Sequence, residues 1–287
     1  MTGEAARHRV AVLGAGVMGT GIATLAIGSG VPVLLVDVDD TILARARTKV
    51  AGQSRLATMM GAFPVDVTPG ELVTTTDLAE LGPVTSVIES VTEQAGLKAK
   101  VLAEASAAVD AGTLIVSNTS AIPIDELADA VGHPEDFLGI HFMNPPYLIE
   151  TVELIHGPRT GAAAITEARL LLSALGRRDV LVGDGPGFVV NRILQRMINE
   201  AARVVEEGIA APEDVDAVFT GCLGHRTGPL RTADIIGLDN VVDSLNVLLE
   251  RTGDQGYRPC ELLLDKVRAG HFGQKTGRGF YDHGGVR

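Results

Sequence analysis

The sequence predicts an α/β fold, with a doubly wound parallel sheet followed by an all-α C-terminal domain. Short β-branched runs alternate with helical stretches through the first two-thirds of the chain, and no convincing strand follows residue 188. The hydrophobic pattern changes at the stretch Gly-Asp-Gly-Pro-Gly over 183–187, from alternating strands and helices to helical periodicity alone. We therefore expect two domains, 1–184 and 185–287, which suits a chain of 287 residues.

Hydrophobic periodicity places the elements of both domains. Strands are expected at residues 10–13, 33–36, 84–88, 113–116, 137–140, 152–155 and 180–182. Helices between them are expected at 17–27, 41–60, 97–109 and 160–175. In the second domain we expect a long helix ending near Gly208, another opening at Pro212, and two more over 235–249 and 260–267.

Charge and composition exclude several classes of function. A formal net charge of −12 argues against nucleic acid or an anionic membrane surface as the main partner. The start does not read as a signal peptide, and no apolar run reaches the roughly 18 to 20 residues of a membrane helix. Cys222 and Cys260 lack metal-ligand spacing, so we expect no metal site, two buried small apolar residues and a reducing cytoplasm.

The motif GAGVMG at residues 14–19 directly follows the first expected strand and opens a helix. In this strand, turn and helix context it predicts the dinucleotide-binding turn of a Rossmann-like domain. The first glycine allows the tight turn, the second lets backbone approach a pyrophosphate, and the third brings helix and strand close. The helix N-terminus would then face the phosphates. The cofactor-binding candidates are Gly14, Gly16, Val17, Met18 and Gly19.

Asp37 ends the second strand, 18 residues after Gly19, where a carboxylate should accept hydrogen bonds from the adenosine ribose. A 2′-phosphate there would meet Asp37, Asp39 and Asp40 with no arginine adjacent, so NAD is favoured over NADP. The alternative is a glycine turn followed by an ordinary strand-ending aspartate.

Four polar elements lie at the ends of expected strands or at the domain junction, where ligands of open α/β sheets bind. His141 suits a general base, because its pKa lies near working pH, and Glu153 could orient it. Ser120 and Asn191 could donate hydrogen bonds to the reacting oxygen and an acyl carbonyl. Taken singly, His141 could be a core histidine and Asn191 an ordinary helix residue. Two asparagines of these elements are cofactor-binding candidates, Asn118 and Asn144.

Six motifs occur in one order along the chain: GAGVMG, VLLVD, VSNTSAIPI, GIHFMNP, VEL and DGPGFVVNR. The candidate residues within them are spaced by 21 residues from Ser120 to His141, 12 from His141 to Glu153 and 50 from His141 to Asn191. In this order and spacing the chain resembles the 3-hydroxyacyl-CoA dehydrogenases over nearly its whole length. The resemblance implies NAD-dependent interconversion of 3-hydroxyacyl and 3-ketoacyl thioesters. It implies His141 as base, Glu153 as its partner, Ser120 and Asn191 as substrate contacts, and Glu93 and Lys98 near the nicotinamide ribose.

The resemblance also implies a homodimer formed through the helical domain. We expect apolar helix faces to form it, including Ile235, Leu238, Val242 and Leu245. The stretch over 277–281, Gly-Arg-Gly-Phe-Tyr, resembles the closing motif of the family. Its alternative interpretation is a plain glycine-rich turn that packs one aromatic ring.

The segment over 53–63 departs from the family pattern, because it carries one arginine and none of the lysine cluster that resembles a clamp for the CoA nucleotide. Together with Arg231 this favours a carrier-protein thioester, as in the branch that oxidises glyceryl-acyl-carrier-protein toward hydroxymalonyl or methoxymalonyl units for polyketides. Ser54 and Arg231 are then substrate candidates, although Arg231 could equally be a solvated helix cation. The alternatives are a short-chain 3-hydroxybutyryl-CoA dehydrogenase, a dehydrogenase of free acids, and a non-catalytic dinucleotide-binding protein of the same fold.

Overall fold

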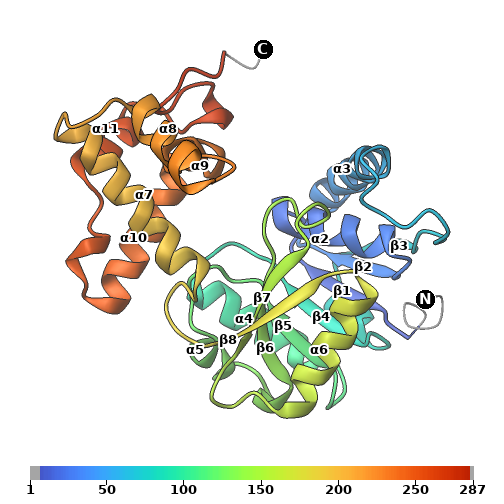
Figure 1. Ribbon diagram of the computed structural model, residues 1–287. Helices are drawn as coiled ribbons and strands as arrows, with labels where there is room; N and C mark the ends of the chain where they lie inside the picture. The colour runs from blue at the N-terminus through green and yellow to red at the C-terminus, as the bar shows by residue number, and fades with distance from the viewer. Residues whose placement is uncertain (1–6, 285–287) are drawn as a thin grey trace. The chain divides into compact units, whose positions relative to one another are not determined.

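The computed structural model describes residues 7–284 (Figure 1). The chain divides into two compact units, residues 1–185 and 186–287. The first unit is built on an eight-stranded sheet, and the second, in its described part, consists of helices joined by turns.

The sheet of the first unit has the order β3-β2-β1-β4-β5-β6-β7-β8, so it grows outward from β1 in both directions. This doubly wound order confirms the predicted fold class. The strands are β1 (Val10–Leu13), β2 (Val33–Val36), β3 (Leu72–Thr75), β4 (Ser86–Glu89), β5 (Leu114–Ser117), β6 (Phe137–His141), β7 (Thr151–His156) and β8 (Arg178–Gly183).

One pair of strands departs from the parallel arrangement expected throughout: β7 runs antiparallel to β6, and β8 then runs parallel to β7. Residues 142–150 connect β6 to β7. Two neighbouring strands can be parallel only if a crossover of about a dozen or more residues, usually a helix, returns the chain to the same end of the sheet. The short connection therefore dictates the reversal.

Strand β3 was not predicted, because it lies at the edge of the sheet and its four residues are mostly half-exposed or exposed. An edge strand of this kind lacks the continuous apolar run that marks a buried strand. Its extended conformation is set by parallel pairing with β2, where Leu34 aligns with Val73.

Helices cover both faces of the sheet (Figure 1). Successive residues of a strand point to opposite faces, so Val10 and Val12 of β1 belong to one apolar core, while Ala11 and Leu13 belong to another. The first core is shared with α2 (Val17–Gly28), α3 (Asp40–Met59) and α6 (Ala162–Ala174), and the second with α4 (Ala95–Ala107). A further short helix, α5 (Ile124–Ala128), follows β5.

The second unit contains α7 (Val190–Glu206), α8 (Pro212–Leu223), α9 (Pro229–Ile236), α10 (Leu238–Thr252) and α11 (Glu261–Arg268). The helix expected over 235–249 is in fact the end of α9 followed by α10. Gly237 separates them with a φ of +98°, a conformation that favours glycine. Helix α9 itself was not predicted.

Two expectations about side chains in this unit are wrong. Leu238 and Leu245 are fully buried in the unit's own core, and Val242 is 6 % exposed, so they cannot form a dimer face. Of the four residues expected there, Ile235 alone is exposed. Cys222 is exposed on α8 rather than buried, whereas Cys260 is buried as expected.

Within residues 7–284, no helix is both long and apolar enough to cross a membrane. In that same part of the chain, no three histidine, cysteine or carboxylate side chains lie together in a way that could hold a metal ion.

Candidate active site

The glycine turn between β1 and α2 has the shape that its sequence predicts. Gly14 has a φ of +98°, and a Cβ there would lie 2.8 Å from the carbonyl oxygen of Ser90. A Cβ on Gly19 would lie 1.8 Å from the carbonyl oxygen of Gly14, so helix and turn meet only because that side chain is absent. A Cβ on Gly16 would meet no protein atom within 4 Å.

Gly16 is therefore not required by the packing of the protein itself. It is the N-cap of α2 and has no side chain to cap the first N–H groups of that helix. An exposed helix N-terminus with open space at its cap fits the pyrophosphate of a dinucleotide. Val17 is 57 % exposed beside it, and Met18 is half-buried.

Asp37 lies beside this turn, as expected. Its Oδ2 accepts a hydrogen bond from the backbone N–H of Ala15 at 2.6 Å, and its Oδ1 accepts from the N–H of Val38 at 2.8 Å. The half-buried carboxylate thus joins the end of β2 to the glycine turn. This contact presents a negative charge at the position where a dinucleotide-binding domain receives the ribose.

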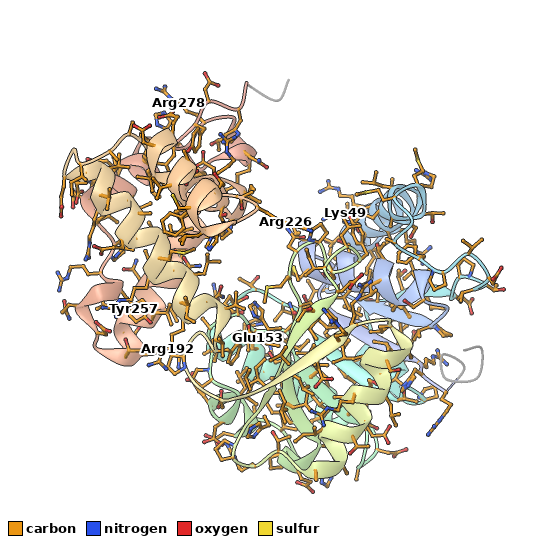
Figure 2. The ribbon with its side chains drawn as sticks, in the orientation of Figure 1. Lys49, Glu153, Arg192, Arg226, Tyr257 and Arg278 are labelled. Atoms are coloured by element: carbon orange, nitrogen blue, oxygen red, sulfur yellow. The ribbon has the colours of Figure 1, made fainter. Side chains whose placement is uncertain are left out.

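His141 and Glu153 form a hydrogen-bonded pair, with 2.8 Å between Nδ1 and Oε2. They are direct partners across the antiparallel ladder of β6 and β7, and each side chain is 6 % exposed. Figure 2 shows Glu153 on its strand. A carboxylate on Nδ1 favours the proton on that nitrogen and leaves the basic lone pair on Nε2. The pair therefore leaves Nε2 able to accept a proton from a bound substrate.

Asn118 connects the ends of β5 and β6. Its Oδ1 accepts a hydrogen bond from the backbone N–H of Phe142 at 3.0 Å, and its own N–H donates to the carbonyl of Glu89 at 2.8 Å. Because Phe142 follows His141 directly, this buried asparagine helps to hold the histidine at the end of its strand. Asn144, a few residues on, is exposed.

Glu93 and Lys98 belong to a network of charges that reaches Ser120. Lys98 is 1 % exposed, and its ammonium nitrogen lies 3.2 Å from the Glu93 carboxylate. The same carboxylate accepts hydrogen bonds from the loop after β5, namely from Thr119 Oγ1 and from the backbone N–H groups of Ser120 and Ala121. Burial alone would raise the pKa of Glu93, but the Lys98 charge and these hydrogen bonds outweigh it, so the pKa is lowered. The carboxylate of Glu93 is therefore charged at neutral pH.

Two further polar members of this network are Glu89, which the sequence analysis missed, and Ser117, which begins the polar element over 117–120 but was not assigned a role. Both are completely buried, and Ser117 Oγ donates to Glu89 Oε2 at 2.6 Å. One signal could have revealed Glu89: it ends an apolar strand, and a carboxylate in such a position needs a charged partner.

The predicted site residues divide between the two units. In the first unit the structure brings His141 together with Glu153, and Ser120 together with Glu93. Ser54 lies half-buried on α3 of the same unit. Asn191 and Arg231 belong to the second unit, on α7 and α9.

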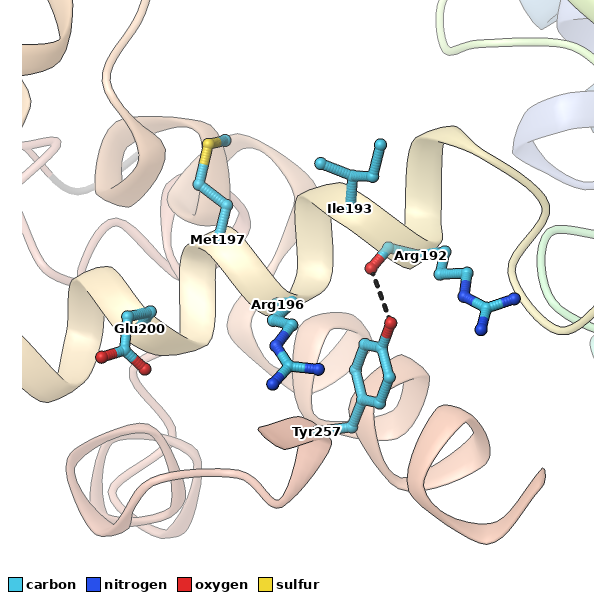
Figure 3. A pocket seen from close by; sticks show the side chains of 6 residues that line it. All are labelled: Arg192, Ile193, Arg196, Met197, Glu200 and Tyr257. Atoms are coloured by element: carbon cyan, nitrogen blue, oxygen red, sulfur yellow. Dashed lines mark hydrogen bonds between the residues drawn. The ribbon is translucent and has the colours of Figure 1, made fainter. Parts of the chain in front are cut away.

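Asn191 lies in the first turn of α7. The residue that follows it, Arg192, lines a hollow of about 690 Å³ together with Tyr257 (Figure 3). Tyr257 Oη donates to the carbonyl of Arg192 at 3.0 Å, and the Arg196 guanidinium lies 5.5 Å from the centre of the tyrosine ring. These contacts fix the start of the helix that carries Asn191.

Arg231 lies over the ring of Tyr281, with 4.3 Å from its guanidinium carbon to the ring centre. The stretch over 277–281 does more than pack one ring: the N–H groups of Phe280 and Tyr281 both donate to Asp234, and Tyr281 Oη donates to Asp216. This closing segment is thus attached to the buried carboxylates of α8 and α9.

A dinucleotide turn and a buried histidine–carboxylate pair on a doubly wound sheet define an NAD-dependent dehydrogenase. Comparison with known families gives the same result. Residues 9–185 match the NAD-binding domain of 3-hydroxyacyl-CoA dehydrogenase, and residues 187–283 match its C-terminal domain. The chain belongs to the 3-hydroxyacyl-CoA dehydrogenase family, and its cofactor is NAD.

Three relatives are similar over nearly their whole lengths. A 3-hydroxybutyryl-CoA dehydrogenase of Bradyrhizobium diazoefficiens is 38 % identical over 282 residues, which are 97 % of this chain and 96 % of that protein. The crystal structure of Mycobacterium tuberculosis FadB2 matches with a TM-score of 0.92 at 36 % identity, covering 96 % of this chain and 99 % of that one. The (S)-3-hydroxybutyryl-CoA dehydrogenase PaaH1 of Ralstonia eutropha matches with a TM-score of 0.88, also at 36 % identity, covering 96 % of this chain and 99 % of that one.

Proposed function

We propose that this protein interconverts 3-hydroxyacyl and 3-ketoacyl thioesters, with a short-chain CoA thioester as its main substrate. The observation that carries the proposal is the buried contact between His141 and Glu153, since a protein that only bound dinucleotide would need no base with an orienting carboxylate. Two of the relatives are named for 3-hydroxybutyryl-CoA, which supports the choice of acyl group.

In this proposal His141 Nε2 takes the proton of the 3-hydroxyl group, and the Glu153 carboxylate stabilises the imidazolium that results. NAD, when bound, accepts the hydrogen and two electrons of the alcohol carbon. In the reductive direction His141 returns its proton to the oxygen. Ser120 and Asn191 donate hydrogen bonds to the reacting oxygen and the thioester carbonyl.

The chain offers a set of contacts for NAD in its first unit. The glycine turn at 14–19 would hold the pyrophosphate, and Asp37 the adenosine ribose. We assign Glu93 and Lys98 to the nicotinamide ribose, with Asn118 and Asn144 beside it. Ser54 and Arg231 are assigned to the thioester carrier.

The direct test follows NADH absorbance with acetoacetyl-CoA, against free acetoacetate and against NADPH as matched controls. We expect rapid oxidation of NADH with the thioester and at least tenfold less with either control. Equal activity on the free acid would show that the enzyme instead acts on free acids.

A second candidate substrate is a glyceryl group on an acyl carrier protein, and the surface of α3 favours it. This helix exposes Arg45, Lys49 and Arg55 within a chain of net charge −12, and Lys49 can be seen in Figure 2. At its end Leu56 and Met59 are 50 % and 86 % exposed. A basic face with an apolar end is complementary to an acidic protein partner.

NAD reduction on glyceryl-loaded carrier protein tests this candidate, with acetoacetyl-CoA reduction as the comparison. If α3 is the docking surface, Arg55→Glu should raise the KM for the loaded carrier protein by about tenfold and leave acetoacetyl-CoA turnover intact. Turnover of acetoacetyl-CoA without any on the loaded carrier protein would reject this second candidate and retain the first.

We further propose that the protein is a cytoplasmic homodimer joined through its second unit. The buried positions of Leu238, Val242 and Leu245 mean that other residues must form the interface. Exposed apolar side chains of this unit, such as Ile193 and Leu223, each 63 % exposed, are available for it.

A further inference from the structure

Glu89, at the end of β4, is a buried carboxylate with no role in the mechanism above. It is 0 % exposed, and each of its oxygens is hydrogen-bonded. Oε1 accepts from Lys98 Nζ at 2.8 Å and from the N–H of Val91 at 2.7 Å, while Oε2 accepts from Ser117 Oγ at 2.6 Å. A carboxylate with these partners is held in one orientation.

Two chains of contacts run from Glu89 to the loop that carries Ser120. In the first, Lys98 joins Glu89 to Glu93, and Glu93 accepts from the N–H of Ser120 at 2.8 Å. In the second, Ser117 donates to Glu89 and its Oγ accepts from the N–H of Thr119 at 3.2 Å. Both series of contacts end at backbone N–H groups of the Ser120 loop, so they determine where the backbone of that loop lies.

The same carboxylate also supports the glycine turn. It holds the N–H of Val91, and this nitrogen and the carbonyl of Ser90 are the atoms against which Gly14 packs. A Cβ on Gly14 would come within 3.1 Å of the Val91 nitrogen. Glu89 therefore lies between the turn proposed for the cofactor and the loop proposed for the substrate.

Fold stability alone is a weak reason for such an arrangement. A buried ion pair contributes little net stability compared with well-packed apolar residues, because both charges lose their hydration. It does impose one geometry on the groups around it. We propose that Glu89 is a positioning residue for the dehydrogenase reaction, which fixes the position of the Ser120 loop relative to the glycine turn. The inference rests on the role proposed for Ser120.

The test compares Glu89→Gln, Ser120→Ala and the double variant in acetoacetyl-CoA reduction. Glu89→Gln keeps the shape and removes the charge, and we expect kcat to fall about tenfold. If Glu89 acts through Ser120, the double variant should be within about twofold of Ser120→Ala alone. A purely structural role would instead multiply the two losses. Glu104→Gln is the matched control, since Glu104 is a half-exposed carboxylate on α4 paired with Lys100, and its kcat should be unchanged.

The outcomes separate this inference from the function on which it rests. A normal kcat in Glu89→Gln, with Ser120→Ala impaired, would overturn the role of Glu89 alone. Full activity of Ser120→Ala would overturn the role of Ser120 and this inference with it. If Glu89→Gln does not fold, Ser117→Ala removes one chain of contacts more gently. It should lower kcat about threefold without adding to Ser120→Ala, and a normal kcat in that variant would reject the proposal.

Discussion

The chemistry proposed for His141 rests on the hydrogen bond between its Nδ1 and Glu153. Both side chains are nearly buried, so the pair is screened little by solvent. Removing either partner leaves the other buried without its counterpart, which costs more than the net contribution of the intact pair. Asp37 and Glu93 also accept hydrogen bonds from backbone N–H groups, and these bonds hold the glycine turn and the Ser120 loop in place.

His141→Ala should lose roughly 10² to 10⁴ in turnover and keep nearly normal NAD affinity, because general-base catalysis contributes about that much. Glu153→Gln keeps the shape but cannot stabilise the imidazolium, so it should also be impaired. The double variant should be little worse than the worse single variant. Steady-state kinetics and NAD titration measure these quantities. Normal turnover of Glu153→Gln from pH 6 to 9 would show that the pair has no catalytic role.

Replacing Asp37 should change the choice of cofactor. Asp37→Ser combined with Val38→Arg removes a carboxylate and adds a cation at a side chain that is 91 % exposed. The preference should move toward NADP by about tenfold to a hundredfold, since repulsion at this site is worth about 1 to 3 kcal/mol. Val38→Arg alone is the control. Wild-type protein that used NADP as readily as NAD at low salt would contradict the role of Asp37.

Glu93 should make stability depend on pH in acid only. Its pKa is lowered from an ordinary value of 4.5, so its contribution is fully present above that value and is lost as the pH falls through the lower folded pKa. Glu93→Gln should therefore flatten the fall in Tm below pH 4.5 and change the dependence little between pH 6 and 8. Thermal unfolding from pH 3 to 8 measures this. Identical profiles for wild type and variant would rule it out.

At the scale of elements, the turn between β1 and α2 and the reversal between β6 and β7 build the site. The turn brings the helix N-terminus to the sheet through two glycines that no other residue could replace without movement. The reversal places Glu153 directly across from His141, on the neighbouring strand. A parallel β7 would need a longer connection and would give a different register.

The glycines of the turn should separate stability from binding. Gly19→Ala would place a Cβ 1.8 Å from the Gly14 carbonyl oxygen, so it should cost about 1 to 3 kcal/mol of stability and lower the Tm. Gly16→Ala meets no protein atom, so its Tm should match wild type while its NAD affinity falls. Calorimetry and NAD titration distinguish the two. Equal destabilisation by both substitutions would contradict this account of the turn.

At the scale of the whole molecule, each unit has its own apolar packing, with two cores on the faces of the sheet in the first unit and one core among the helices of the second. The first unit holds the dinucleotide turn and the histidine pair, and the second buries its own helices around Leu230, Leu238 and Leu245. The net charge of −12 should keep the protein dispersed in solution while leaving specific association possible.

We expect sedimentation to show a stable dimer at micromolar concentration, because an interface large enough for an obligate dimer makes dissociation inseparable from unfolding. Leu245→Ala should lower stability by about 2 to 5 kcal/mol through a cavity in the core, without changing the sedimentation of folded protein. Ile193→Asp places a charge on an exposed apolar position and tests one candidate contact. A stable, active wild-type monomer would contradict the dimer.

The sequence by itself determined the features that depend on near neighbours in the chain. The glycine motif follows its strand directly, and its conformational demands are those of Gly14 and Gly19. The strands of the sheet interior were predicted because burial on both faces requires continuous apolar runs. His141 and Asp37 were chosen as candidates for a related reason, since a polar side chain at the end of such a run lies at the edge where ligands bind.

Only the tertiary structure decided the features that depend on distant partners. The edge strand β3 is extended because it pairs with β2, and Glu89 is tolerated in the core because Lys98 reaches it from the next helix. The apolar stripe of α10 could equally have faced a second subunit, and packing against the other helices buries it within its own unit. A periodic pattern indicates that the apolar face of a helix must be buried. The surface that buries this face depends on the free energy of packing the whole chain.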